Sequence, residues 1–186
     1  MTTAVRARAA LRAGALGGYV LAVEWARALF EQVPGWTTAA LLIGGAALAI
    51  TAIGWSPDRL GLGTSRVWLR ILGGLALGAV LLLPGAARSG GAPLLPGGLA
   101  AAAIAVSIGE EVAFRGALYA ALEEIGGAHL AVIGSTLLWT LAHALSHPPA
   151  FLGAVATAGL LLALWRWACK DLVGPILAHV IADLAL

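Results

Sequence analysis

The sequence WTTAALLIGGAALAITAIGW at residues 36–55 decides the class of fold. It contains no charged residue, and a tryptophan stands at each end. A helix needs about 20 apolar residues to cross the hydrocarbon core of a bilayer, and tryptophan is enriched at both membrane surfaces. The stretch therefore predicts a membrane-spanning helix.

The composition extends this prediction to the whole chain. Of its 186 residues, 61% are hydrophobic and only 11% are charged, whereas about 25% are charged in an ordinary soluble domain. The mean hydropathy is +0.95. A soluble protein of this length needs far more polar surface. A soluble enzyme, a disordered chain and a nucleic-acid-binding protein are therefore excluded, the last because a net charge of +2 provides no basic patch.

Further apolar segments lie on both sides of residues 36–55, and together they predict one domain over residues 1–186. We expect an all-α, polytopic transmembrane helix bundle of about seven spans. Seven spans leave only short loops, so there is no room for a second domain. The spans are expected at about 11–30, 36–55, 69–87, 97–124, 128–146, 149–167 and 172–186. The first is the weakest, since it contains Arg12, Glu24 and Arg27. We interpret it as a helix that the protein retains, and not as a signal peptide that is cleaved off.

The Lys and Arg residues of the expected loops predict the orientation, because they concentrate on the cytoplasmic side. An inside N-terminus leaves only Arg27 and Arg88 on the outer side. The inner side then holds Arg6, Arg8, Arg12, Arg59, Arg66, Arg70, Arg166 and Lys170. We therefore expect the N-terminus inside and the C-terminus outside.

The few ionisable side chains inside the expected spans are the candidate functional residues. Each costs about 2.5–3.5 kcal/mol near the centre of a bilayer, so we expect them to face one another in the bundle interior. They are Glu110, Glu111, Arg115, His143, His179 and Asp183. The single cysteine, Cys169, excludes an intramolecular disulfide and a cysteine-based zinc site.

Helical spacing indicates how the first three are arranged. Glu111 and Arg115 are four residues apart, so they share a helix face and can form an ion pair. Glu110 lies ~100° around the helix from Glu111, which leaves it free for another role.

The remaining candidates come in two pairs with the same spacing. His143 follows Trp139 by four residues, and Asp183 follows His179 by four. Two imidazoles and two carboxylates from three helices can activate water by general base catalysis, or bind a divalent metal that does so. A transport or proton-relay role and a purely structural ion network are the alternatives from chemistry alone.

Three motifs carry a resemblance to a known family. They are EEVAFRG at 110–116, TLLWTLAHAL at 136–145 and GPILAHVIADLAL at 174–186. Their order and spacing resemble the EExxxR, aromatic–histidine and HxxxN or HxxxD motifs of the CAAX prenyl protease and bacteriocin-processing (CPBP, ABI-type) family of intramembrane glutamic endopeptidases. The resemblance covers about residues 55–186. Trp139 stands where this family more often has Phe, and Asp183 where it often has Asn.

The resemblance implies that Glu110, His143, His179 and Asp183 are catalytic. Glu110 would deprotonate the attacking water, and His143 would help to hold that water. His179 and Asp183 would stabilise the developing oxyanion. Asp183 could do so as a protonated donor, or it could stay ionised and orient His179, which its spacing slightly favours.

Glu111, Arg115 and Trp139 have supporting roles on the same resemblance, bracing the site or contacting substrate. Metal dependence in this family is argued both ways, but EExxxR is not an HExxH pair, whose two histidines share one helix face, so we expect no metal cofactor. Zinc is the alternative, and its ligands would then be the four catalytic residues.

The predicted function is an intramembrane endopeptidase of the bacterial inner membrane. Its partners would be the lipid bilayer and a membrane-anchored protein or peptide, cleaved at a C-terminal anchor, a sorting signal as in myxosortases, or a leader. The Ala-, Arg- and Gly-rich composition indicates a high-GC bacterium, in which prenylated substrates are not expected. The rival function is a non-proteolytic membrane protein, either a transporter or proton relay, or a bacteriocin immunity or binding factor.

Overall fold

The computed structural model describes residues 3–86 and 95–185, and over these residues the chain is helical and has no β-strand. The expected all-α class is therefore confirmed. The helices are α1 (Thr3–Glu31), α2 (Thr37–Ala49), α3 (Pro57–Leu60), α4 (Val67–Ala86), α5 (Gly97–Glu111), α6 (Tyr119–Ala142), α7 (Leu152–Cys169) and α8 (Val173–Ala185).

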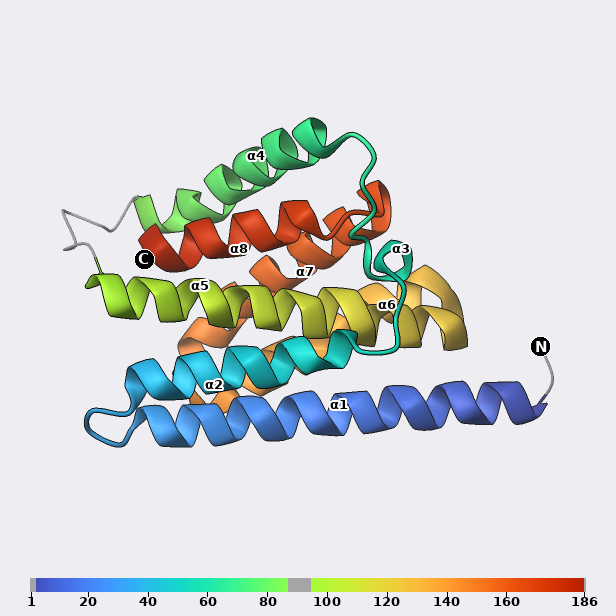
Figure 1. Ribbon diagram of the computed structural model, residues 1–186, viewed down its shortest axis with the longest axis horizontal. Coiled ribbons are helices and arrows are strands. Elements are labelled where there is room, and N and C mark those ends of the chain that lie inside the picture. The colour runs from blue at the N-terminus through green and yellow to red at the C-terminus, as the bar shows by residue number, and fades with distance from the viewer. Residues whose placement is uncertain (1–2, 87–94, 186) are drawn as a thin grey trace.

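The longer helices lie near the predicted spans. Two apolar helical segments, Gly97–Leu145 and Pro149–Cys169, are long enough to cross a bilayer, and three more, Thr37–Ala52, Val67–Leu83 and Val173–Ala185, are shorter. The number of crossings remains a prediction. In Figure 1, α1 begins at one end of the bundle and α8 finishes at the other, as an odd number of crossings requires.

Helix α5 lies at the centre of the bundle. It packs against α2 on one side and α8 on the other, and α4 packs on α8. Helix α1 packs on α2 and α6, and α7 packs on α6 (Figure 1). The α2–α5 contact is backbone to backbone, because a Cβ atom at Gly109 would collide with the carbonyl oxygen of Gly45. This contact fixes the position of the residue next to Gly109, which is Glu110.

The chain doubles back at a glycine pair between the two predicted spans 97–124 and 128–146. Gly126 has φ −138° and ψ 19°, and Gly127 has φ 71° and ψ −170°, a conformation that is essentially restricted to glycine. Trp139 contacts Glu110, although 29 residues separate them. A continuous helix would place them about 44 Å apart, so the two halves form a helical hairpin.

A short π-helix, η2 (Val112–Leu118), joins α5 to α6. All seven of its residues are buried. The expected span 97–124 is therefore not a uniform α-helix. Single π-turns inserted in α-helices occur frequently at functional sites, and this one follows Glu110 and Glu111 directly.

The outer surface of the bundle is apolar. Large hydrophobic side chains point outward from several helices, among them Leu11, Ile43, Leu83 and Leu137. Exposed apolar area on this scale marks a surface that contacts other apolar groups, and it fits the expected lipid environment. Cys169 is also exposed, at the end of α7.

Two cations that were counted with the charges at the two membrane surfaces lie inside the bundle. Arg27 is buried in α1, where Glu24 and Glu31 pair with it, and Arg166 is buried in α7 and donates to backbone carbonyl groups. Both should therefore be left out of the count of surface charges, because partners inside the bundle satisfy the charge of Arg27 and the donors of Arg166. Arg88 lies outside the described residues. Without Arg27, Arg88 and Arg166, the number of Lys and Arg residues in the expected loops still favours an inside N-terminus. The orientation remains a prediction.

Candidate active site

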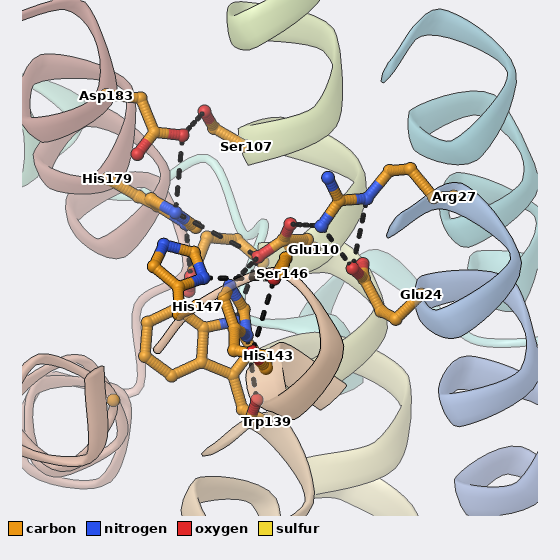
Figure 2. Close-up of polar contacts among 12 residues, drawn as sticks. Glu24, Arg27, Ser107, Glu110, Trp139, His143, Ser146, His147, His179 and Asp183 are labelled. Carbon is orange, nitrogen blue, oxygen red and sulfur yellow. Dashed lines mark hydrogen bonds and ion pairs between the residues drawn. The ribbon is translucent and has the colours of Figure 1, made fainter. Parts of the chain in front are cut away.

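Glu110, in the last turn of α5, is the centre of a buried polar cluster (Figure 2). Its Oε2 atom accepts a hydrogen bond of 2.9 Å from the indole Nε1 of Trp139. The same oxygen lies 3.6 Å from Nε2 of His143 and 4.0 Å from Nε2 of His179. Three distant parts of the sequence, in α5, at the end of α6 and in α8, therefore meet at one carboxylate oxygen.

The end of α6 sets the orientation of His143. The helix ends at Ala142, and His143 begins the 3-10 turn η3 (His143–Leu145). Its Nδ1 atom lies 2.8 Å from the carbonyl oxygen of Trp139, which can only accept a hydrogen bond. Nδ1 therefore carries the proton, and Nε2 faces Glu110. The ring also packs edge-on against the Trp139 indole, with 4.6 Å between the ring centroids.

A carboxylate from α5 orients His179 in the same way. The Nδ1 atom of His179 lies 2.9 Å from Oε1 of Glu111. An ionised carboxylate can only accept, so Nδ1 is the donor and Nε2 faces the site. Both imidazoles thus direct the same ring nitrogen at Glu110.

The predicted ion pair within the first motif is present and completely buried. Arg115 Nη1 donates to Oε1 of Glu111 over 2.8 Å, and neither side chain is exposed. Arg115 also donates through Nη2 to the carbonyl oxygen of Gly159 and stacks over the Trp139 ring at 4.3 Å. A Cβ atom at Gly159 would lie 2.5 Å from that ring, so α7 approaches the cluster closely only because position 159 is glycine.

Asp183 lies at the edge of the cluster, where 36% of its side chain is exposed. Its Oδ2 atom is 2.7 Å from the hydroxyl of Ser107 and 3.5 Å from Nε2 of His179. The distance to His179 is too long for a hydrogen bond of ordinary strength. Glu111 makes the shorter contact with that ring, and the orientation of His179 by Asp183 remains a prediction.

The sequence analysis missed a second buried ion cluster, contributed by α1. Arg27 donates through Nε and Nη2 to Oε2 of Glu24 and through Nη1 to Glu31. Its Nη2 atom lies 3.4 Å from Oε1 of Glu110 (Figure 2). Glu24 and Arg27 were interpreted as weakening the span 11–30. Their i,i+3 and i,i+4 spacing around Arg27 was the sequence signal that could have identified them.

The arrangement of the His, Asp and Glu side chains bears on the alternative in which the site holds a zinc ion. Within residues 3–86 and 95–185, no group of three or more His, Cys, Asp or Glu side chains is arranged to hold a metal ion. We therefore derive no step through a metal. The predicted use of Glu110, His143, His179 and Asp183 as zinc ligands remains open to test by chelation.

One family model matches the chain. It is described as type II CAAX prenyl endopeptidase Rce1-like, and it covers residues 92–185. The matched region includes α5 to α8, the first two motifs and the third as far as residue 185, but it does not include α1. No curated protein and no solved structure matches the sequence.

Proposed function

The chain belongs to the Rce1-like family of type II CAAX prenyl endopeptidases, and we propose that it is an intramembrane endopeptidase in which Glu110 activates the attacking water. The family consists of membrane proteins with protease activity. The choice of Glu110 as the general base, the substrate and the number of membrane crossings are our proposals.

The observation that supports Glu110 most directly is the arrangement around its Oε2 atom. Two imidazole Nε2 atoms face this oxygen at 3.6 Å and 4.0 Å, too far for strong hydrogen bonds to it. The three atoms therefore keep hydrogen-bonding capacity for a water molecule. Trp139 holds the carboxylate from one side without taking its proton-accepting role, because an oxygen of an ionised carboxylate has two lone pairs.

A general-base mechanism follows from this arrangement. Glu110 removes a proton from water while the oxygen of that water adds to the scissile carbonyl carbon. The carbonyl oxygen becomes an oxyanion, and His179 stabilises it by donating from Nε2 in its imidazolium form. Glu110 then transfers the proton to the departing nitrogen as the carbon–nitrogen bond breaks. His143 holds the water through Nε2.

The position of the site suggests how substrate reaches it. Glu110 is 13 residues after Gly97, about 20 Å along the helix, and α6 ends beside it at Ala142. Asp183 is the most exposed of the catalytic candidates. With the N-terminus inside, this exposed edge faces the outer half of the membrane. We propose that a membrane-anchored protein or peptide enters laterally and is cleaved near its anchor, sorting signal or leader.

The sidedness can be tested separately from the chemistry. A phosphatase fused to the C-terminus, active only outside the cytoplasm, should be active. A C-terminal reporter that works only in the cytoplasm should be inactive. The reverse result would contradict the proposed orientation.

The substitution Glu110→Gln tests the mechanism. The purified protein would be assayed in lipid vesicles with two quenched fluorescent peptides, one farnesylated and ending in a CAAX sequence, the other unprenylated with a hydrophobic C-terminal anchor. Glu110→Gln should reduce cleavage by about 10²- to 10⁴-fold, since an amide cannot accept the proton of the water.

Glu123→Gln is the matched control. It makes the same chemical change at a partly exposed carboxylate that pairs with Lys170, and it should retain cleavage. Normal cleavage by Glu110→Gln would refute the mechanism. Failure of the wild-type protein to cleave either peptide would contradict the proposed activity and favour the non-proteolytic alternative.

A further inference from the structure

We propose that Arg27 in α1 is a positioning residue that fixes the carboxylate of Glu110. This inference rests on the proposed function, and it makes the first helix part of the active site although the family match begins after it. Arg27 is not assigned a contact with substrate. It would act through Glu110, and Glu24 and Glu31 would hold it in place.

The burial of this group indicates that its contacts are specific. The side chain of Arg27 is 7% exposed and that of Glu24 is not exposed at all, and both lie in the last two turns of α1. Charged groups in such a place are costly unless they are paired, and a buried ion pair is weak evidence for added stability. Their contact with Glu110 gives them a role that stability alone does not explain.

The two oxygens of Glu110 have different partners, and this division is the core of the argument. Oε1 faces Arg27 at 3.4 Å, whereas Oε2 accepts from Trp139 and faces both imidazoles. Rotation about the last side-chain bond would exchange the two oxygens. A donor on each oxygen fixes the plane of the carboxylate, so that Oε2 stays directed at the position of the water.

Two further contacts hold α1 at the height that this geometry requires. Trp25 donates from Nε1 to the carbonyl oxygen of Leu141, the residue before the last of α6, over 3.1 Å. On the other face, the aliphatic part of Arg27 lies against Gly44 of α2, where an added Cβ atom would be 2.7 Å from Cδ of Arg27. The guanidinium therefore reaches Glu110 through a passage that a glycine leaves open.

The test compares Arg27→Gln with Arg27→Lys in the peptide assay described above. Misplacing a catalytic group by about 1 Å can cost ~10²-fold in rate, so kcat of Arg27→Gln should fall by about 10- to 100-fold. KM should stay within about twofold, because substrate does not contact Arg27. Arg27→Lys should recover part of kcat, since it restores a cation but not the planar guanidinium with its several donors.

Arg12→Gln is the matched control, because Arg12 is also in α1 and forms an ion pair, with Glu124, away from the site. It should leave kcat unchanged. If Arg27→Gln fails to fold because Glu24 is left unpaired, the double variant Glu24→Gln with Arg27→Gln removes both charges and serves in its place.

Wild-type kcat in a folded Arg27→Gln or double variant would overturn the inference. A raised KM with unchanged kcat would also overturn it, since that pattern indicates a substrate contact. An equal loss in Arg12→Gln would do the same. In each case an inactive Glu110→Gln would leave the proposed function standing, whereas an active Glu110→Gln would refute the general-base role itself.

Discussion

Ionisable side chains lie on both sides of Glu110, but the two sides differ in how many of their hydrogen-bond donors and acceptors have a close partner. On the α1 side, the guanidinium of Arg27 is surrounded by the carboxylates of Glu24, Glu31 and Glu110. On the α8 side, His179 keeps Nε2 free of any short contact, and Asp183 is partly exposed. Figure 2 shows Glu110 between these two groups.

This difference separates residues that position Glu110 from residues that can contact the water or the substrate. The buried guanidinium of Arg27 directs four of its five N–H donors at Glu24, Glu31 and Glu110, so its role is to fix its neighbours. A group with a free nitrogen or oxygen at an exposed edge can bind water or an oxyanion. We infer that α8 supplies the reacting side of the site and α1 the rigid side.

The strongest test of this contrast is Arg115→Gln, which removes the support of the α8 side. The change leaves Glu111 buried without its ion pair, and Glu111 orients His179. Breaking a buried pair in this way typically costs about 3–5 kcal/mol. Reversible unfolding in mixed detergent micelles should show this loss.

Lys170→Gln is the control for Arg115→Gln. Lys170 pairs with Glu123 on the surface, so its loss should cost less than about 1 kcal/mol. If Arg115→Gln cost no more than this control, the α8 side would not depend on its buried ion pair.

Asp183 tests whether the α8 side is the reacting side. Asp183→Ala should lower kcat by about 10²-fold, the size of effect seen when one oxyanion donor is removed. Asp183→Asn should retain most activity, because an amide can donate to an oxyanion and to Ser107. Both variants should unfold like the wild type, since the side chain is partly exposed.

A different outcome would reassign Asp183. If Asp183→Asn is folded but inactive, and a chelator inhibits the wild-type protein, the negative charge is needed to hold a metal ion. Activity of the wild type that withstands the chelator, together with active Asp183→Asn, would support the oxyanion role.

Gly159→Ala tests the packing beneath both sides. Its methyl group would meet the Trp139 ring at 2.5 Å, and Trp139 is the residue that donates to Glu110. Overpacking of this kind costs about 1–3 kcal/mol, and we expect a fall in kcat with it. Gly153→Ala, in the same helix, has open space around the new methyl group and should not lower stability.

The smallest effect is expected for Arg12→Gln. Arg12 pairs with Glu124 and stacks over Trp55, but about half of its side chain is exposed. An exposed ion pair contributes about 0–1 kcal/mol. A larger loss in thermal unfolding would show that α1 is held to the bundle at this end as well as at Arg27.

The sequence allowed the local part of the site to be predicted. The Glu111–Arg115 ion pair follows from i,i+4 spacing within one helix, and the turn at 126–127 follows from two adjacent glycines. The contact between Glu111 and His179 joins residues 68 positions apart, so it depends on how α5 and α8 pack. No local pattern specifies such a contact.

Two other features were missed for different reasons. Arg27 was misjudged because a charge in an apolar span was taken as a defect, when the spacing of Glu24 and Glu31 already provided its partners. The π-helix Val112–Leu118 was not predicted because its hydrogen-bond register depends on packing against neighbouring helices.

The exposed thiol of Cys169 allows the sidedness of the wild-type protein to be measured by chemical labelling. It is the single cysteine of the sequence, and it lies where α7 ends, next to Lys170 in the left-handed region at φ 52°. A maleimide that cannot cross membranes therefore modifies one known position without any engineered residue. With the N-terminus inside, intact cells should remain unlabelled and inverted vesicles should be labelled to completion.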